Sequence, residues 1–222
     1  AYEMLRSLVG SEMCIRDRFL GRWFTVKTLE SLKSNLSDKF IRLFLQKKER
    51  LFQMARLFFS VDVHGSELVW RKWLNTPRHR GAKIVLFCGD LTGKSVIPLI
   101  KKGENRWTCK LVGRNWDIKG EEEKRKMEKR ICDLGYYPIE MEPEEVEECR
   151  RNPKKVEGLF RKLMTERLEN WLSMAVENLG KDVTIVCMPG NDDELYIDEV
   201  IKKFEKEYEN VIYPLDKVVE FE

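Results

Sequence analysis

Nearly continuous apolar runs, each about as long as a β-strand, recur along the chain and alternate with segments in which apolar residues have helical spacing. The runs cover residues 57–61, 83–88 and 183–188. Strands that are apolar at every position are typical of a parallel sheet with both faces covered, because neither side-chain direction faces water. The alternation of such strands with helices predicts a mixed α/β (α+β) fold.

A long insertion, about residues 103–180, separates the second and third apolar runs. We expect it to form a mainly helical cap beside the main sheet. Its spacing predicts a hairpin over residues 106–118 and helices over residues 121–134, from Pro143 onward, and over residues 154–179. Elsewhere the pattern predicts helices over residues 66–74 and 197–208, a short helix or turn around Pro98, and strands over residues 211–213 and 218–221. Trp70, Trp73, Cys88 and Cys187 are expected in the core, and His79 in a surface loop.

The first 53 residues of the chain are considered apart from the rest because of a non-native resemblance and an uneven charge. Residues 7–18 resemble translated sequencing-adapter read-through, so residues 1–18 are set aside as a non-native segment. Residues 19–53 carry 8 basic and 3 acidic side chains and a helical pattern but no site motif. They are either a genuine helical extension or sequence that precedes the true start. Met54 directly precedes the first predicted strand, so we take residues 54–222 as the functional domain.

Composition excludes several classes of protein. The chain has 222 residues, with 41 Lys and Arg against 38 Asp and Glu. A net charge of only +3 argues against a dedicated nucleic-acid-binding protein, and no basic surface is evident. No apolar run reaches the roughly 18 to 20 residues of a membrane span. The 6 cysteines are scattered without a CxxC pair, which argues against a zinc knuckle or a disulfide scaffold and favours a reduced, cytoplasmic location. Function must therefore reside in a specific site.

An acid-bearing motif follows each of the three predicted parallel strands. The motifs are Asp62-Val63-His64-Gly65, Gly89-Asp90 and Gly190-Asn191-Asp192-Asp193. A single Asp after a strand is most often a helix cap or turn residue, but the carboxyl ends of parallel strands share one edge, where ligands bind. Asp62 and His64, two apart in an extended segment, can point to one side. The Asp90 carboxylate can bridge two ions, and Asn191 offers an amide oxygen.

These side chains predict a site for divalent metal ions. A mixture of carboxylate, imidazole and amide ligands suits Mn, Fe or Zn better than calcium. The four aspartates, Asp62, Asp90, Asp192 and Asp193, would raise one another's pKa unless cations lay between them. We therefore expect two divalent metal ions as cofactors.

The order Asp-x-His, Gly-Asp and Gly-Asn-x-Asp, each after a strand, resembles the motifs of the calcineurin-like metallophosphoesterase superfamily. The resemblance covers Met54 to the end of the chain. It implies that Asp62 and His64 bind the first metal, that Asp90 bridges the two metals, and that Asn191 binds the second. It also implies a two-layered β-sandwich flanked by helices, with the dimetal site at the carboxyl ends of the strands, and hydrolysis of a phosphoester.

The sequence departs from the family pattern at three points. Gly93 stands where the family usually has a second Asp, and Asp192 stands where a His normally follows the Asn. Members that lack this His resemble the branch associated with phosphodiesters, so we favour a phosphodiester substrate. The family supplies three more histidines, whereas this chain has only His64 and His79. We therefore expect the coding sequence to be cut at its C-terminus and this chain to be weakly active or inactive.

Other residues near the motifs have expected roles in the same reaction. Two cations about 3.5 to 4 Å apart lower the pKa of a bridging water and hold the phosphoryl oxygens. Asp192 and Lys94 are the expected catalytic side chains, with Lys94 offsetting charge on the phosphate. The simpler alternative for Lys94 is a solvated lysine at a helix start. Asp193, Gly65 and Thr92 are expected to support the ligands or to contact the substrate.

Two other functions are compatible with the sequence. Residues 88–95 read Cys-Gly-Asp-Leu-Thr-Gly-Lys-Ser, which is close to a phosphate-binding P-loop and would make the chain a nucleotide-binding protein. That alternative leaves Asp62, His64 and Asn191 without a role. A non-catalytic binding or regulatory protein on the same scaffold would explain the absent histidines equally well.

Overall fold

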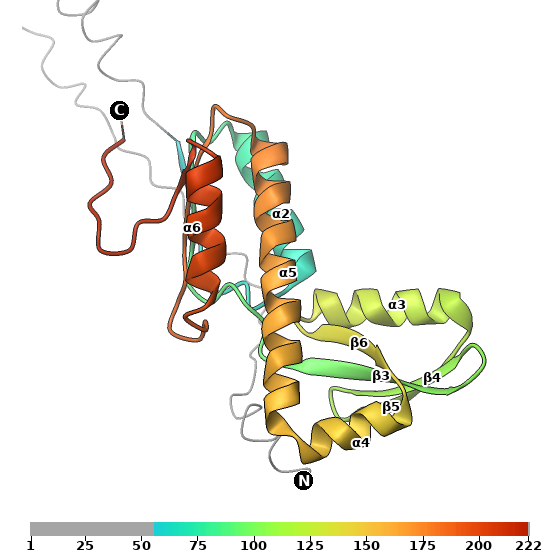
Figure 1. Ribbon diagram of the computed structural model, residues 1–222. Coiled ribbons are helices and arrows are strands. Elements are labelled where there is room, and N and C mark those ends of the chain that lie inside the picture. Colours follow the sequence, from blue (N-terminus) through green and yellow to red (C-terminus); the bar gives the residue numbers. More distant parts are fainter. Residues whose placement is uncertain (1–55, 222) are drawn as a thin grey trace, which may run out of the picture.

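The computed structural model describes residues 56–221, which form two four-stranded sheets, each with its own hydrophobic core (Figure 1). Sheet A is parallel throughout and has the strand order β1-β2-β7-β8. Its strands are β1 (Leu57–Ser60), β2 (Ile84–Cys88), β7 (Thr184–Met188) and β8 (Val211–Ile212). With five helices among the described residues, this arrangement confirms the predicted mixed α/β class. The predictions made for residues 1–53 lie outside the described residues.

Helices cover one face of sheet A, where alternate strand residues are buried and nearly all are apolar. Phe58, Val85 and Ile185 are paired across the sheet and contribute to the larger core. The covering helices are α2 (Glu67–Arg80), α5 (Pro153–Leu179) and α6 (Ile197–Glu207). Trp70 and Trp171 stack at 4.7 Å between ring centroids, which joins α2 to α5. The predicted core positions of Trp70 and Trp73 are confirmed, at 0% and 6% exposure.

The opposite face of sheet A is apolar but has no helical layer in the described part of the chain. Phe59 and Val61 are 37% and 41% exposed there. An open cleft of about 610 Å³ separates this face from the C-terminal segment that contains Pro214 and Phe221. Parallel sheets are usually covered on both faces, so this surface is unusual for its type.

The segment between β2 and β7 contains sheet B, whose order is β5-β4-β3-β6, and its first strand precedes the predicted insertion. Its strands are β3 (Val96–Gly103), β4 (Arg106–Leu111), β5 (Arg114–Lys119) and β6 (Tyr137–Met141). Helix α3 (Gly120–Asp133) packs on one face through Met127 and Ile131, and α4 (Pro143–Arg151) lies against β3. The predicted hairpin and the helices of the insertion are confirmed. Helices α3, α4 and α5 cover most of residues 103–180, so the insertion is mainly helical as predicted, although it also contributes β4, β5 and β6 to sheet B.

The segment around Pro98 is a strand rather than the helix or turn that we predicted. Pro98 pairs with Ile139 of β6, whereas the pairing of β3 with β4 begins only at Ile100. The missing proline N–H therefore removes no hydrogen bond on the β4 side, and the β-branched neighbours favour a strand.

Several smaller predictions can also be checked. Residues 218–221 do not form the expected strand, and His79 lies exposed in the last turn of α2 rather than in a loop. Cys88 and Cys187 are buried as expected, and burial raises the pKa of the Cys88 thiol to about 11.

Helix α5 runs along both parts of the molecule (Figure 1): Leu168 lies in the core of sheet A, and Phe160 contacts Tyr137 of sheet B. None of the described helices is both long and apolar enough to cross a bilayer.

Candidate metal centre

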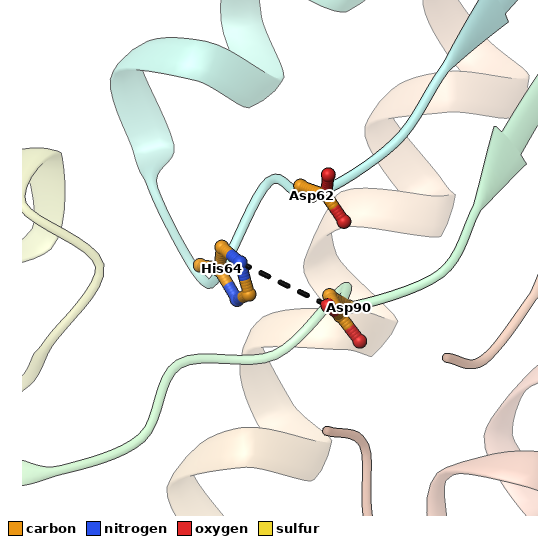
Figure 2. Close-up of side chains that lie close together, drawn as sticks. All are labelled: Asp62, His64 and Asp90. Atoms are coloured by element: carbon orange, nitrogen blue, oxygen red, sulfur yellow. Dashed lines mark ion pairs between the residues drawn. The ribbon is translucent and has the colours of Figure 1, made fainter. Parts of the chain in front are cut away.

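Three potential metal ligands meet at the carboxyl edge of sheet A. Asp62 and His64 follow β1, and Asp90 follows β2. One ligand atom from each of these side chains lies within 4.8 Å of the others (Figure 2). His64 Nε2 is 3.9 Å from Asp90 Oδ2. Because β1 and β2 are parallel neighbours, both loops leave the sheet at the same edge.

All three residues have left-handed backbone conformations. The φ angles are 62° for Asp62, 45° for His64 and 49° for Asp90. Non-glycine residues in this region cost roughly 1–3 kcal/mol each and persist only where the surroundings hold them. The extended geometry that we expected for the Asp-x-His segment is therefore wrong, and the side chains meet through a turn. Strained residues cluster at functional sites. The backbone conformation and the ligand chemistry therefore both indicate a functional site at these three residues.

Backbone hydrogen bonds between the two loops maintain this conformation. Asp62 N donates to Gly89 O at 3.2 Å, and His64 N donates to Asp90 O at 2.8 Å. Gly65 N continues the pattern by donating to Leu91 O at 3.0 Å. The first two loops are therefore tied together beyond the ends of their strands.

The donor set fits a transition-metal or zinc ion. Two carboxylates and one imidazole are hard and borderline ligands. The His64 and Asp90 side chains are 29% and 13% exposed, whereas Asp62 is exposed, so the group is accessible to solvent. His64 Nδ1 is buried and has no hydrogen-bond partner among the described residues. A buried nitrogen without a partner is unfavourable, and the other ring nitrogen, Nε2, is the one that faces Asp90.

A third loop, residues 189–193 after β7, closes over Asp90. A Cβ atom on Gly190 would lie 2.3 Å from Asp90 N and 2.4 Å from Asp90 Oδ1, so this close approach requires glycine. Asp192 N donates to Asp90 Oδ1 at 3.1 Å. Asn191 lines the same cleft as Asp62 and Asp90. The structure thus brings all four predicted ligands to the carboxyl edge of sheet A, where Asn191 is exposed to solvent.

Asp193 fastens the third loop to the second. Its carboxylate accepts hydrogen bonds from Leu91 N (2.9 Å), Thr92 N (2.8 Å), Thr92 Oγ1 (2.6 Å) and Gly190 N (2.8 Å). Thr92 is 4% exposed. Both side chains are therefore occupied within the protein and orient the loops.

Lys94 and Asp192 form an ion pair at the opening of the site. The hydrogen bond from Lys94 lowers the pKa of Asp192, and the nearby His64 adds to this effect. Our expectation that crowding would raise the pKa of this aspartate is therefore wrong, because a lysine neutralises it. Lys94 does not start a helix, since β3 follows at Val96.

The P-loop alternative finds no support in this segment. A P-loop binds phosphate at the N-terminus of the helix that follows it. Residues 88–95 lead into a strand instead, and the Lys94 ammonium is already paired with Asp192.

Three residues of the inserted segment contact the site but were not predicted from the sequence. Gly135, Tyr137 and Arg167 contact the loops at His64, Gly93 and Gly65 respectively. They lie outside the three motifs, and no local spacing relates them to those motifs. Only the folding of the insertion onto the edge of sheet A could have revealed them.

Comparison with known proteins returns no match: no family model fits the chain, and neither a curated protein nor a solved structure is significantly similar to it. The class of the protein is therefore defined by its own structure, which is a mixed α/β fold with a candidate metal centre at the carboxyl edge of a parallel sheet.

Proposed function

We propose that the protein is a metal-dependent phosphoesterase of the calcineurin-like type. The observation that carries this proposal is the convergence of Asp62, His64 and Asp90 within 4.8 Å, all in left-handed conformations. Neither helix capping nor hairpin turns explain three such residues at one edge. The three motifs that carry the family resemblance are the loops that meet there.

In this proposal Asp62 and His64 bind one divalent ion, Asp90 bridges, and Asn191 binds the second ion. The two oxygens of Asp90 support the bridging role because they face different loops. Oδ2 faces His64 at 3.9 Å, and Oδ1 accepts the hydrogen bond from Asp192 N at 3.1 Å. Mn, Fe or Zn fits these ligands.

A pair of such ions supplies a water nucleophile of lowered pKa and a clamp for the phosphoryl oxygens. The chain itself supplies Lys94, whose ammonium lies at the opening of the site and can offset charge on a bound phosphate. The anionic partner of Lys94, Asp192, repels a dianionic monoester more strongly than a monoanionic diester. We therefore favour a phosphodiester as substrate.

The face of sheet A that residues 56–221 leave without a helical layer supports the two-layered sandwich within the same proposal. Phe59, Val61 and Met188 lie along an apolar surface of the kind against which a second sheet packs. Such a layer would also complete the wall of the cleft that Asp62, Asp90 and Asn191 line.

Metal binding by the full chain tests the proposal directly. Wild type, Asp62→Ala and Asp90→Ala would be titrated with Mn²⁺, with free Mn²⁺ followed by electron paramagnetic resonance. Asp117→Ala is a matched control, because Asp117 is an exposed aspartate on sheet B that pairs with Arg106. Because the family's further histidines are absent, we expect weak Mn²⁺ binding, which both site variants lose and the control keeps. Equal binding by all four proteins would refute the proposal.

Turnover separates the proposed enzyme from its alternatives. Hydrolysis of bis(p-nitrophenyl) phosphate faster than p-nitrophenyl phosphate is expected for a diesterase. Because this chain is expected to be weakly active or inactive, metal binding without turnover of either ester would be compatible with both the phosphoesterase and the non-catalytic binding protein. Nucleotide affinity that survives Asp62→Ala and Asp90→Ala but disappears in Lys94→Ala would favour the nucleotide-binding alternative.

A further inference from the structure

One turn of the inserted part of the chain, residues 134–136 between α3 and β6, contacts the loops of the metal centre through backbone. A Cβ atom on Gly135 would lie 2.2 Å from His64 O. One on Gly93 would lie 1.9 Å from Gly135 O, and one on Gly65 would lie 2.6 Å from Gly93 Cα. Three backbone segments are thus in contact with no side chain between them, so the turn braces the main chain of His64 directly.

Arg167 of α5 joins this turn to the loop that carries the ligands. Its Nη1 donates to Gly65 O and to Tyr136 O, both at 2.9 Å. Its Nη2 contacts Cys132 Sγ at 3.2 Å, and its Nε lies 3.8 Å from Glu67 Oε1. The side chain is only 10% exposed. One guanidinium therefore binds the backbone carbonyl of Gly65, the residue that follows His64.

Two further contacts fix the orientation of the same junction. The guanidinium of Arg167 lies 4.1 Å from the centre of the Tyr137 ring, and Tyr137 Oη accepts a hydrogen bond from Gly93 N at 2.9 Å. Ser66 Oγ donates to Asp133 O at 2.6 Å. The inserted segment is thus bonded to the loop after β1 and to the loop after β2.

We propose that Arg167 is a positioning residue of the metal centre, which holds residues 62–65 in the strained conformation that directs His64 toward Asp62 and Asp90; this proposal rests on the metal-dependent function above. The left-handed conformation at His64 persists only while neighbouring contacts enforce it. Loss of the guanidinium removes two charge-assisted hydrogen bonds from the junction, and the loop can then relax. Arg167 does not touch the ligand atoms, so it acts through the backbone of its neighbours.

The test compares Arg167→Met and Arg167→Lys with Lys162→Met in the full chain. Lys162 lies on the same helix and is 69% exposed in an ion pair with Glu166, which makes it a matched control. Mn²⁺ affinity would be measured at a temperature at which circular dichroism shows each variant to be folded. Residues that orient metal ligands typically change metal affinity by about 10 to 100-fold, and we expect a loss of that size for Arg167→Met. We expect a smaller loss for Arg167→Lys and less than a twofold change for the control.

The outcomes distinguish this inference from the proposed function. If wild type binds no Mn²⁺, the function fails and the role of Arg167 fails with it. If wild type binds and folded Arg167→Met binds equally well, only the role of Arg167 is overturned, and a lower melting temperature alone would then indicate a structural residue. If Arg167→Met does not fold, Arg167→Lys decides, because an ammonium keeps the charge but cannot reproduce the fixed fork of a guanidinium. Unchanged affinity in that variant would also overturn the proposal.

Discussion

Sheet A and sheet B place their polar groups in opposite ways. On sheet B charges are matched within the fold: Arg106 donates to both oxygens of Asp117 at 3.1 and 2.7 Å, and Lys124 pairs with Glu140. At the edge of sheet A, Asp62 and Asp90 form no ion pair with a lysine or arginine of the described chain, and His64 is their common neighbour. Ion pairs within the fold stabilise it modestly. Carboxylates that lie together without a basic partner repel one another, and a bound cation would relieve this repulsion.

The backbone shows the same contrast. Asn105 and Val112 have left-handed conformations on sheet B, and both lie in hairpin turns, where such angles are ordinary. Asp62, His64 and Asp90 have similar angles without a hairpin to explain them. Strain on sheet A therefore coincides with the ligands, while on sheet B it coincides with chain reversal.

The largest expected effect comes from filling the contact between the two parts. In Gly93→Ala the new methyl group would lie 1.9 Å from Gly135 O, and backbone cannot move aside as a flexible side chain can. We expect a loss of about 3 kcal/mol or more in the free energy of unfolding, measured by urea denaturation, together with weaker Mn²⁺ binding.

Gly158→Ala provides the control for that substitution. Gly158 lies in α5, and a Cβ atom there meets nothing within 4 Å. Alanine is the better helix former, so this variant should be more stable by about 0.5–1 kcal/mol. A Gly93→Ala protein as stable as wild type would show that the junction is not tightly packed.

Asp193→Ala is expected to have the next largest effect, because it separates the second loop from the third. The substitution leaves Leu91 N, Thr92 N and Gly190 N without their acceptor. A buried unsatisfied group costs about 1–3 kcal/mol, and water can replace part of the loss, so we expect roughly 3 kcal/mol in urea unfolding. Asp117→Ala on sheet B should cost much less, because its ion pair with Arg106 is exposed to solvent. Similar losses in the two variants would contradict the comparison of the sheets.

The sequence predicted sheet A and the meeting of its loops because both depend on local patterns. Apolar runs gave the strands, and parallel strands direct their following loops to one edge. The extended Asp-x-His geometry was wrong because φ depends on backbone bonds to Gly89 and Asp90, which no spacing encodes. The strand at Pro98 was missed because its partner in β6 comes about 40 residues later. The contact of Arg167 with Gly65 is likewise a product of tertiary packing.

Metal addition should stabilise the protein by a moderate amount, through sheet A alone. A ligand that binds only the folded state at 100 times its Kd adds about 2.7 kcal/mol of stability. We therefore expect Mn²⁺ at that excess to raise the melting temperature of wild type and EDTA to reverse the change. Asp90→Asn should show no such shift, because the bridging carboxylate is absent. An equal rise in Asp90→Asn would mean that Mn²⁺ binds elsewhere, for example among acids of the inserted segment.

The smallest effect is expected at the ion pair of Arg106 and Asp117 on sheet B, and it depends on pH. The hydrogen bond from Arg106 lowers the pKa of the Asp117 carboxyl below its ordinary value of 3.8. The folded protein therefore holds this proton less tightly than the unfolded chain, so the pair stabilises the fold above pH 3.8 and loses that contribution as the pH falls through the lowered pKa. Asp117→Asn should lower the urea midpoint slightly at pH 6, and the difference from wild type should vanish toward pH 2.5. Because both side chains are exposed, 1 M NaCl should also reduce the difference. A difference that persists at low pH would mean that Asp117 acts through packing rather than through its charge, which would weaken the contrast between the two sheets.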